Sequence, residues 1–102
     1  MSQLKNVCVT LNNPDFPAAD LTFDPAHVSY AVWQLERGEN GTLHIQAYVE
    51  LKQRARYAQI VQRIPQFAGA HFEKRRGSAQ EASDYCEKED TRVEGEQYCF
   101  PT

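Results

Sequence analysis

Hydrophobic and polar residues alternate with a period of two along several short stretches of the chain, which is the pattern of strands with one buried face. Asn40-Gly41 stands between two such stretches and is a strong signal for a hairpin turn. The pattern predicts strands at residues 5–11, 27–36, 43–51 and 69–76, and a last edge strand within 91–102.

Two other stretches have helical periodicity. Apolar residues recur at i, i+3, i+4 and i+7 within 54–64, which predicts a helix that ends before Pro65. A second helix is predicted over 78–90, where Ser78 and Glu81 have the spacing of a capping box. Because strands dominate and the helices lie between them, the expected fold class is α+β with an antiparallel sheet.

One face of the strand at 43–51 is unusual, because it carries His44 and Gln46 next to a turn. If Glu36 pairs with His44 across the hairpin, apolar residues share one face, and Glu36, His44 and Gln46 gather on the other. Opposite side chains lie roughly 5 Å apart at Cβ, which would let all three converge on one ion. A carboxylate, an imidazole and an amide oxygen suit Mg²⁺ or Mn²⁺. A solvated polar face is the alternative.

The same register pairs residues of like character along the whole hairpin. The pairs are Leu35 with Ile45, Trp33 with Ala47 and Ala31 with Val49 on the apolar face, and Gln34 with Gln46 and Val32 with Tyr48 on the other.

The second helix carries a possible nucleophile. Ala79, Ala82 and Cys86 form a small apolar stripe, and Tyr85 lies at its margin with Lys88 one turn further on. A tyrosine beside a lysine can act as an activated phenolate. The alternative is that Tyr85 packs against the core and Lys88 is solvated.

Composition places the chain among globular proteins. It has 102 residues, 41% of them hydrophobic and 11% aromatic, which predicts one domain with a single modest core. No apolar run reaches membrane-spanning length, and the N-terminal residues lack the apolar core of a signal peptide. Cys8, Cys86 and Cys99 form no disulfide framework, which favours a reducing compartment.

The formal net charge of −3 hides an uneven distribution. Residues 52–76 carry seven basic side chains against one acid, whereas residues 77–102 carry seven acids against two bases. A local basic surface of this kind can bind phosphates although the whole chain is acidic. Ordinary solvated charge is the alternative.

Three ordered motifs resemble the replication initiator (Rep) of small circular single-stranded DNA viruses. They are "CVTLNNP" at 8–14, "HIQ" at 44–46 and "YCEK" at 85–88, similar to the family's first motif, its HUH motif with Gln in place of the second His, and its YxxK motif. "GAHFEKRRG" at 69–77 and "KEDTR" at 88–92 are similar to nanovirus-type initiators and, after them, to circovirus initiators.

The resemblance implies a HUH endonuclease domain spanning 1–102, with a central five-stranded antiparallel sheet flanked by helices and a shape like RNA-recognition modules. It implies that Glu36, His44 and Gln46 bind Mn²⁺ or Mg²⁺, that Tyr85 is the catalytic nucleophile and that Lys88 assists it. The implied reaction is nicking and rejoining of one DNA strand through a 5′-phosphotyrosine, which initiates rolling-circle replication.

The resemblance also implies partners and a location. The partners would be the single-stranded viral origin with its stem-loop and, in a full-length protein, other initiator protomers, with no membrane involved. The place would be the host nucleus, and the family's helicase domain has no counterpart in this chain. The implied DNA contacts are Asn12, Asn13, Lys52, Arg54, Arg56, Lys74, Arg75 and Arg76.

Two other functions are weighed against this one. A non-catalytic module that binds single-stranded nucleic acid could stack bases on Tyr30, Tyr48 or Phe72. A zinc protein could use His44, His71, Cys86 and Cys99, although their spacing matches no standard zinc motif.

Overall fold

The computed structural model describes residues 3–101 and gives each predicted element a counterpart. The predicted ranges 1–102 and 91–102 also include residues 1, 2 and 102, which lie outside the described residues. Within 3–101 the elements are β1 (Leu4–Asn12), β2 (Val28–Arg37), β3 (Leu43–Ala55), α1 (Tyr57–Arg63), β4 (His71–Lys74), α2 (Ala79–Tyr85) and β5 (Arg92–Phe100), with short 3-10 helices at Ala18–Asp20 and Pro65–Phe67.

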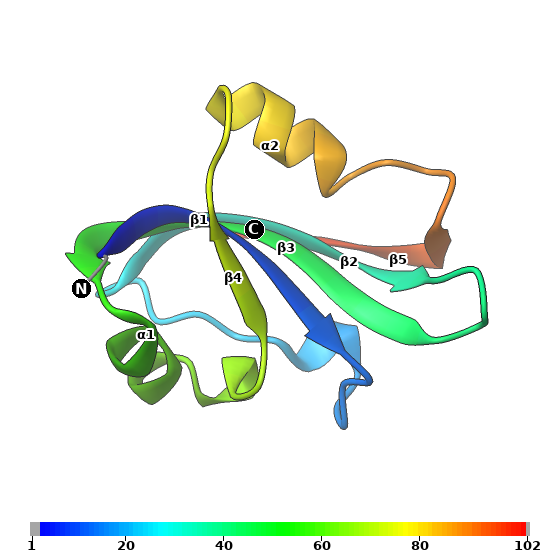
Figure 1. Cartoon of the computed structure of the whole chain (residues 1–102), viewed down its shortest axis with the longest axis horizontal. Helices are drawn as coiled ribbons and strands as arrows, with labels where there is room; N and C mark the ends of the chain where they lie inside the picture. The colour runs from blue at the N-terminus through cyan, green and yellow to red at the C-terminus, as the bar shows by residue number, and fades with distance from the viewer. Residues whose placement is uncertain (1–2, 102) are drawn as a thin grey trace.

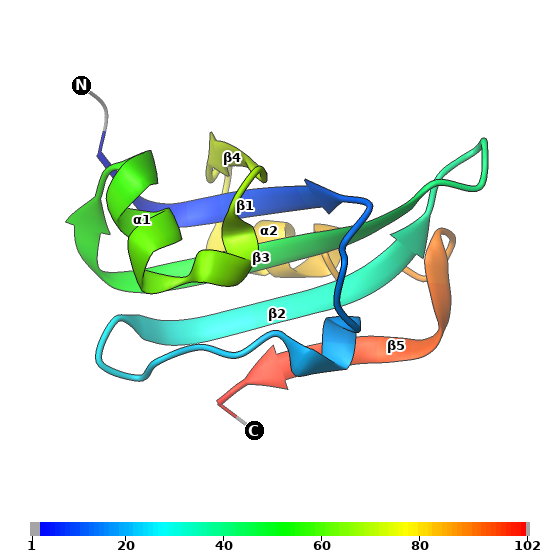
Figure 2. The same ribbon diagram turned by 90° about the horizontal axis from the view of Figure 1, so that it is seen from below.

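The strands form one antiparallel sheet in the order β4-β1-β3-β2-β5, which confirms the predicted α+β class and the central five-stranded sheet. α1 covers one face of this sheet and α2 covers the other (Figure 1). The connection from β1 to β2 runs along the α1 side, beside β2 and β5 (Figure 2). The two faces of the sheet are therefore covered by different segments.

The predicted register between β2 and β3 is confirmed at every pair. Glu36 is the partner of His44, and Gln34 is the partner of Gln46. The hairpin turn is also confirmed: Gly41 has a φ of 83°, and the N–H of Gly38 donates to the carbonyl of Thr42 at 2.8 Å. Because side chains alternate along each strand, this register separates an apolar face from a polar one.

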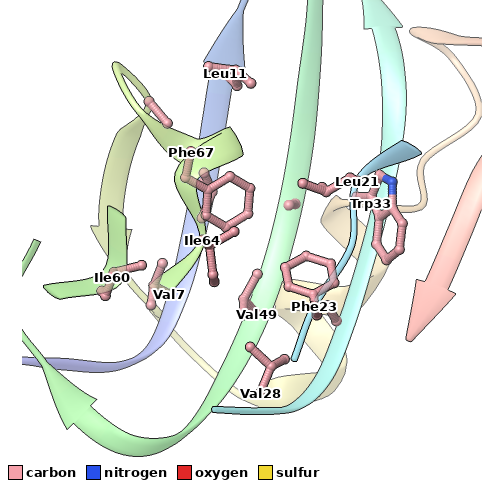
Figure 3. Close-up of a cluster of buried hydrophobic side chains, with 14 of the residues drawn as sticks. Val7, Leu11, Leu21, Phe23, Val28, Trp33, Val49, Ile60, Ile64 and Phe67 are labelled. Carbon is pink, nitrogen blue, oxygen red and sulfur yellow. The ribbon is translucent and has the colours of Figure 1, made fainter. Parts of the chain in front are cut away.

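The main hydrophobic core lies on the α1 side of the sheet (Figure 3). Alternate residues of β1, β2 and β3 meet residues of α1, the 3-10 helix after it and the β1–β2 connection there. The indole N–H of Trp33 donates to the carbonyl of Ala18 at 2.8 Å and fixes that connection. Labelled core residues in Figure 3 include Val7, Leu11, Phe23, Trp33, Val49, Ile60, Ile64 and Phe67.

A smaller buried cluster lies on the α2 side. It consists of Val32, Tyr48, Ala82 and Cys86, with Ala79 packed against it. The predicted apolar stripe of the second helix is therefore confirmed. Because these side chains are small except for Tyr48, α2 can lie close to the sheet, and it covers neighbouring polar residues as well.

The first helix begins later than predicted. Residues 54–55 belong to β3, where Ala55 is fully buried and pairs with Leu4 of β1. Helix α1 begins at Tyr57, after Arg56 in an extended conformation whose N–H donates to Gln59 Oε1 at 3.0 Å. Burial of Ala55 in the core prolongs the strand past the point where helical periodicity begins.

The second helix ends earlier than predicted. The capping box is confirmed, because the Glu81 N–H donates to Ser78 Oγ and the Ser78 N–H donates to Glu81 Oε1. The helix nevertheless stops at Tyr85, and the chain turns toward β5, where the Arg37 N–H donates to the Thr91 carbonyl. Both α-helices in 3–101 have seven residues, and no helix there is long and apolar enough to cross a membrane.

The fold predicts different reactivities for two thiols. Burial raises the pKa of the Cys86 thiol to about 12, whereas Cys99 is exposed on the edge strand β5. Since the thiolate is the reactive form, iodoacetamide at about pH 8 should modify Cys99 and spare Cys86 in the folded protein. Both should react in concentrated guanidinium. Peptide mass mapping measures this, and rapid labelling of Cys86 in the folded protein would contradict its burial at the end of α2.

Candidate functional site

A group of polar side chains lies on the α2 side of the sheet, beside the small apolar cluster. Gln34, Glu36 and Gln46 are 0%, 2% and 6% exposed, and His44 is half-buried. A solvated face would leave these side chains open to water, so that interpretation is wrong. Burying polar groups this deeply lowers the stability of the fold unless they have hydrogen-bond partners.

The carboxylate of Glu36 is held from two sides. His44 Nε2 lies 2.9 Å from its Oε1, and Gln34 Nε2 donates to its Oε2 at 2.7 Å. Within residues 3–101, its ionic partner is His44. A buried carboxylate needs compensating positive charge, which a protonated histidine or a bound cation can supply.

The amide of Gln46 is oriented by two hydrogen bonds. Its Nε2 donates to the carbonyl of Val9 at 3.2 Å, and its Oε1 accepts from the hydroxyl of Thr10 at 3.1 Å. Because the Val9 carbonyl only accepts, the NH₂ group must face β1. The amide oxygen is thereby fixed on the side of Thr10.

Glu36, His44 and Gln46 therefore have the chemistry to hold a divalent cation that prefers oxygen and imidazole ligands. No group of three or more His, Cys, Asp and Glu side chains in residues 3–101 is arranged to hold a metal. The zinc interpretation based on His44, His71, Cys86 and Cys99 is therefore wrong. Any cation site here depends on the amide of Gln46 as its third donor.

Tyr85 is the last residue of α2, and its side chain is 54% exposed. The ammonium of Lys88 lies 4.3 Å from the centroid of the Tyr85 ring. The predicted proximity is confirmed, but Lys88 follows the helix instead of lying one helical turn further within it. The alternative in which Tyr85 packs into the core is wrong, because the ring is open to solvent.

Tyr85 and Gln46 line the same cleft, which has a volume of about 320 Å³. Thr10 and Cys8 of β1 form part of its wall, and Lys74 and Arg76 add positive charge. The two acidic residues of the wall are already engaged, Glu73 with His71 at 3.0 Å and Glu81 with the N-terminus of α2. The cleft therefore combines an exposed phenol, a buried amide and two cationic groups.

The predicted DNA-binding residues outside the cleft lie in two regions, one next to the cleft and one apart from it. Arg54, Lys74 and Arg75 line a hollow next to the cleft, together with Lys5. Lys52 and Arg56 are exposed near the same end of β3. Asn12 and Asn13 lie apart, in a hollow formed with the start of the β1–β2 connection.

Among the predicted DNA-binding residues, Arg75 has a side chain that is anchored within the protein. Its Nη1 donates to the Tyr48 hydroxyl at 3.0 Å, and that hydroxyl donates to Glu50 Oε2 at 2.6 Å. Burial, followed by the hydrogen bond to Glu50, raises the pKa of Tyr48 to about 12. The phenol therefore stays neutral and keeps Arg75 in place.

Sequence reasoning assigned no role to three residues that take part in this region, Thr10, Gln34 and Lys5, although it placed Gln34 on the polar face. Strand periodicity is the signal for Gln34 and Thr10, since they share a face with Glu36 and Gln46. Lys5 gave no signal, because its proximity to Arg54 depends on the pairing of β1 with β3.

Comparisons with known proteins agree on one family. The family model described as "Putative viral replication protein" matches residues 5–89. The chain is 48% identical over 86 residues to the "Master replication protein" of Banana bunchy top virus, and 50% identical over 88 residues to that of Subterranean clover stunt virus. These matches cover 84% and 86% of this chain and 28% of each relative.

A more distant match comes from an animal virus. The "Replication-associated protein" of Pigeon circovirus is 41% identical over 88 residues, which cover 83% of this chain and 26% of that protein. The chain thus spans less than a third of the length of these relatives.

Proposed function

The chain belongs to the viral replication protein family, and from that premise we propose that it is a metal-dependent endonuclease that nicks and rejoins single-stranded viral origin DNA. The observation that carries this proposal is the shared cleft, where an exposed tyrosine faces the same space as a proposed metal ligand. A nucleophile and an electrostatic centre at one phosphate are what strand cleavage needs.

Glu36, His44 and Gln46 would hold the metal, either Mn²⁺ or Mg²⁺. The fixed orientations of Glu36 and Gln46 support this role, because preorganised ligands lose little freedom on binding. When bound, the cation would supply positive charge and Lewis acidity at the scissile phosphate.

Tyr85 would be the nucleophile. Its oxygen attacks phosphorus in line with the bond to the 3′ oxygen, so that an O–P bond to tyrosine forms as the P–O3′ bond breaks. The phenol loses its proton and the departing 3′ oxygen gains one, which leaves a free 3′-OH and a 5′-phosphotyrosine. The energy of the phosphodiester is retained, so a later 3′-OH can attack this link and reseal the strand.

Lys88 would assist from beside the ring. Its ammonium already lies over the Tyr85 face, where a positive charge stabilises negative charge that develops on the phenolic oxygen and the phosphate. The basic residues around the cleft would bind the DNA backbone. Lys74 and Arg76 lie at the cleft itself, and Arg54 and Arg75 lie beside it.

A non-catalytic base-stacking module is the second candidate, and the packing of the aromatic residues argues against it. Tyr48 is fully buried, and Tyr30 packs against it with ring centroids 6.2 Å apart. Phe72 is half-buried between Tyr57 and Phe67. Tyr48 therefore offers no ring face to a base, and Tyr30 and Phe72 each already have an aromatic partner within the protein, whereas stacking recognition requires an open ring.

The metal assignment predicts that two substitutions weaken metal binding and nicking together. His44→Ala and Gln46→Ala each remove a proposed ligand and leave the apolar face of β3 intact. Both should lower Mn²⁺ affinity, measured by titration calorimetry, and the nicking rate on origin DNA. His27→Ala is the control, since His27 lies just before β2, at the end of the strand remote from Glu36. A folded His44→Ala protein with wild-type affinity and cleavage would refute the site.

The nucleophile assignment predicts that Tyr85→Phe abolishes cleavage and covalent attachment while folding and DNA binding remain. The ring is retained and only the phenolic oxygen is lost. Single-stranded origin DNA with Mn²⁺ is resolved on a denaturing gel, where the covalent adduct is retarded. Tyr98→Phe is the matched control and should still form the adduct. Robust adduct formation by Tyr85→Phe would rule out this nucleophile.

The DNA path predicts a change in salt dependence. Arg54→Gln, Lys74→Gln and Arg76→Gln should weaken binding across all sequences, and each lost phosphate contact should reduce the salt slope by about 0.7 for a single strand. Arg63→Gln on α1 is the control and should keep the parent slope. Fluorescence anisotropy at several salt concentrations measures both quantities. Unchanged slopes for all three variants would place the DNA elsewhere.

A further inference from the structure

Gln34 is a fully buried glutamine that the proposed reaction does not use. Its Nε2 donates to Glu36 Oε2 at 2.7 Å and to the backbone carbonyl of Lys88 at 2.7 Å. Both partners can only accept, so the NH₂ group must point at them and the side-chain orientation is fixed. Each of the two amide hydrogens has one partner.

These two bonds join parts of the site that are far apart in the sequence. One end of the bridge is the carboxylate of a proposed metal ligand on β2, and the other is the chain segment just after α2. The carbonyl that Gln34 binds belongs to Lys88, whose ammonium lies 4.3 Å from the centroid of the Tyr85 ring. A continuous series of contacts therefore runs from Glu36 through Gln34 and Lys88 to Tyr85.

Burial of the Gln34 amide does not serve the stability of the fold. Within residues 3–101, Gln34 Oε1 is buried and has no hydrogen-bond partner. A buried amide with an unpaired oxygen stabilises a protein less than an apolar side chain of similar size would. The two hydrogen bonds of the NH₂ group give a reason for a glutamine at this position, since an apolar side chain could make neither bond.

We propose that Gln34 is a positioning residue that sets Glu36 for the metal and holds the Lys88 segment, and with it Tyr85, at a fixed place relative to that metal. This inference rests on the proposed function for its catalytic half. Its other half, the orientation of Glu36, concerns metal binding alone. Neighbours that orient a metal ligand typically change affinity or activity by about 10- to 100-fold when they are removed.

The test is Gln34→Met, which keeps an unbranched side chain of similar length and removes both donors. Gln66→Met is the matched control, because the Gln66 amide also makes two hydrogen bonds, in this case to two backbone groups, the Thr22 N–H and the Asp20 carbonyl, both at 3.0 Å. Gln66 lies in the short helix after α1, on the opposite side of the sheet from α2. Urea unfolding shows that both variants are folded before other measurements are compared.

Gln34→Met should lower Mn²⁺ affinity by about 10-fold or more in calorimetric titration, and Gln66→Met should not. At saturating Mn²⁺ and DNA, Gln34→Met should also lower kcat by about 10-fold, since the Lys88 segment is no longer held. In a Lys88→Ala background the same substitution should lower kcat by a smaller factor, because part of its effect passes through Lys88.

The possible failures are distinguishable. Wild-type Mn²⁺ affinity and kcat in folded Gln34→Met would overturn the inference and leave the proposed function standing. If the parent protein forms no covalent adduct, the proposed function and the kcat part fail, while a loss of Mn²⁺ affinity in Gln34→Met would still support the orientation of Glu36. Equal fold-losses of kcat with and without Lys88→Ala would overturn the link to Lys88.

Discussion

The register between β2 and β3 is the constraint on which the candidate site depends. It places Glu36 opposite His44 and Gln34 opposite Gln46, so that all four side chains share the α2 side of the sheet. Because side chains alternate with a period of two, a slip of one residue would turn one strand's polar side chains into the main core. The apolar residues that alternate with them resist that slip, so the core holds the site in register.

The strands and this register could be predicted because the signals that determine them lie in short, continuous stretches of sequence. Alternation along β2 and β3, together with the Asn40-Gly41 turn, is enough to align the hairpin, and the alignment brings Glu36, His44 and Gln46 together. The capping box at Ser78 was predictable for the same reason, since both of its partners lie within one turn. Features set by neighbours in sequence were found correctly.

Features that depend on tertiary contacts were not predicted correctly from the sequence. Periodicity alone extended the second helix to residue 90, but hydrogen bonds from Gln34 to the Lys88 carbonyl and from Arg37 to the Thr91 carbonyl draw the chain away from α2. From the sequence, the polar face could equally have been solvated. In the structure α2 packs over Tyr48 on that side of the sheet, and Gln34, Glu36 and Gln46 are buried there. The anchoring of Arg75 by Tyr48 likewise joins residues 27 positions apart, beyond the reach of any local pattern.

Strand order explains how an acidic chain can present a basic surface to a polyanion. The sheet places β4, with Lys74 and the arginines after it, at one edge, and β5, with Glu94 and Glu96, at the other. Neighbouring strands are about 4.8 Å apart, so the two edges are separated by about 19 Å. That exceeds the screening length of about 8 Å at physiological salt, so the acidic edge barely reduces the potential at the basic one. The acids of β5 therefore do not oppose a DNA path along the β4 side. The acids at the cleft with Tyr85 are Glu73, which pairs with His71, and Glu81, which caps α2.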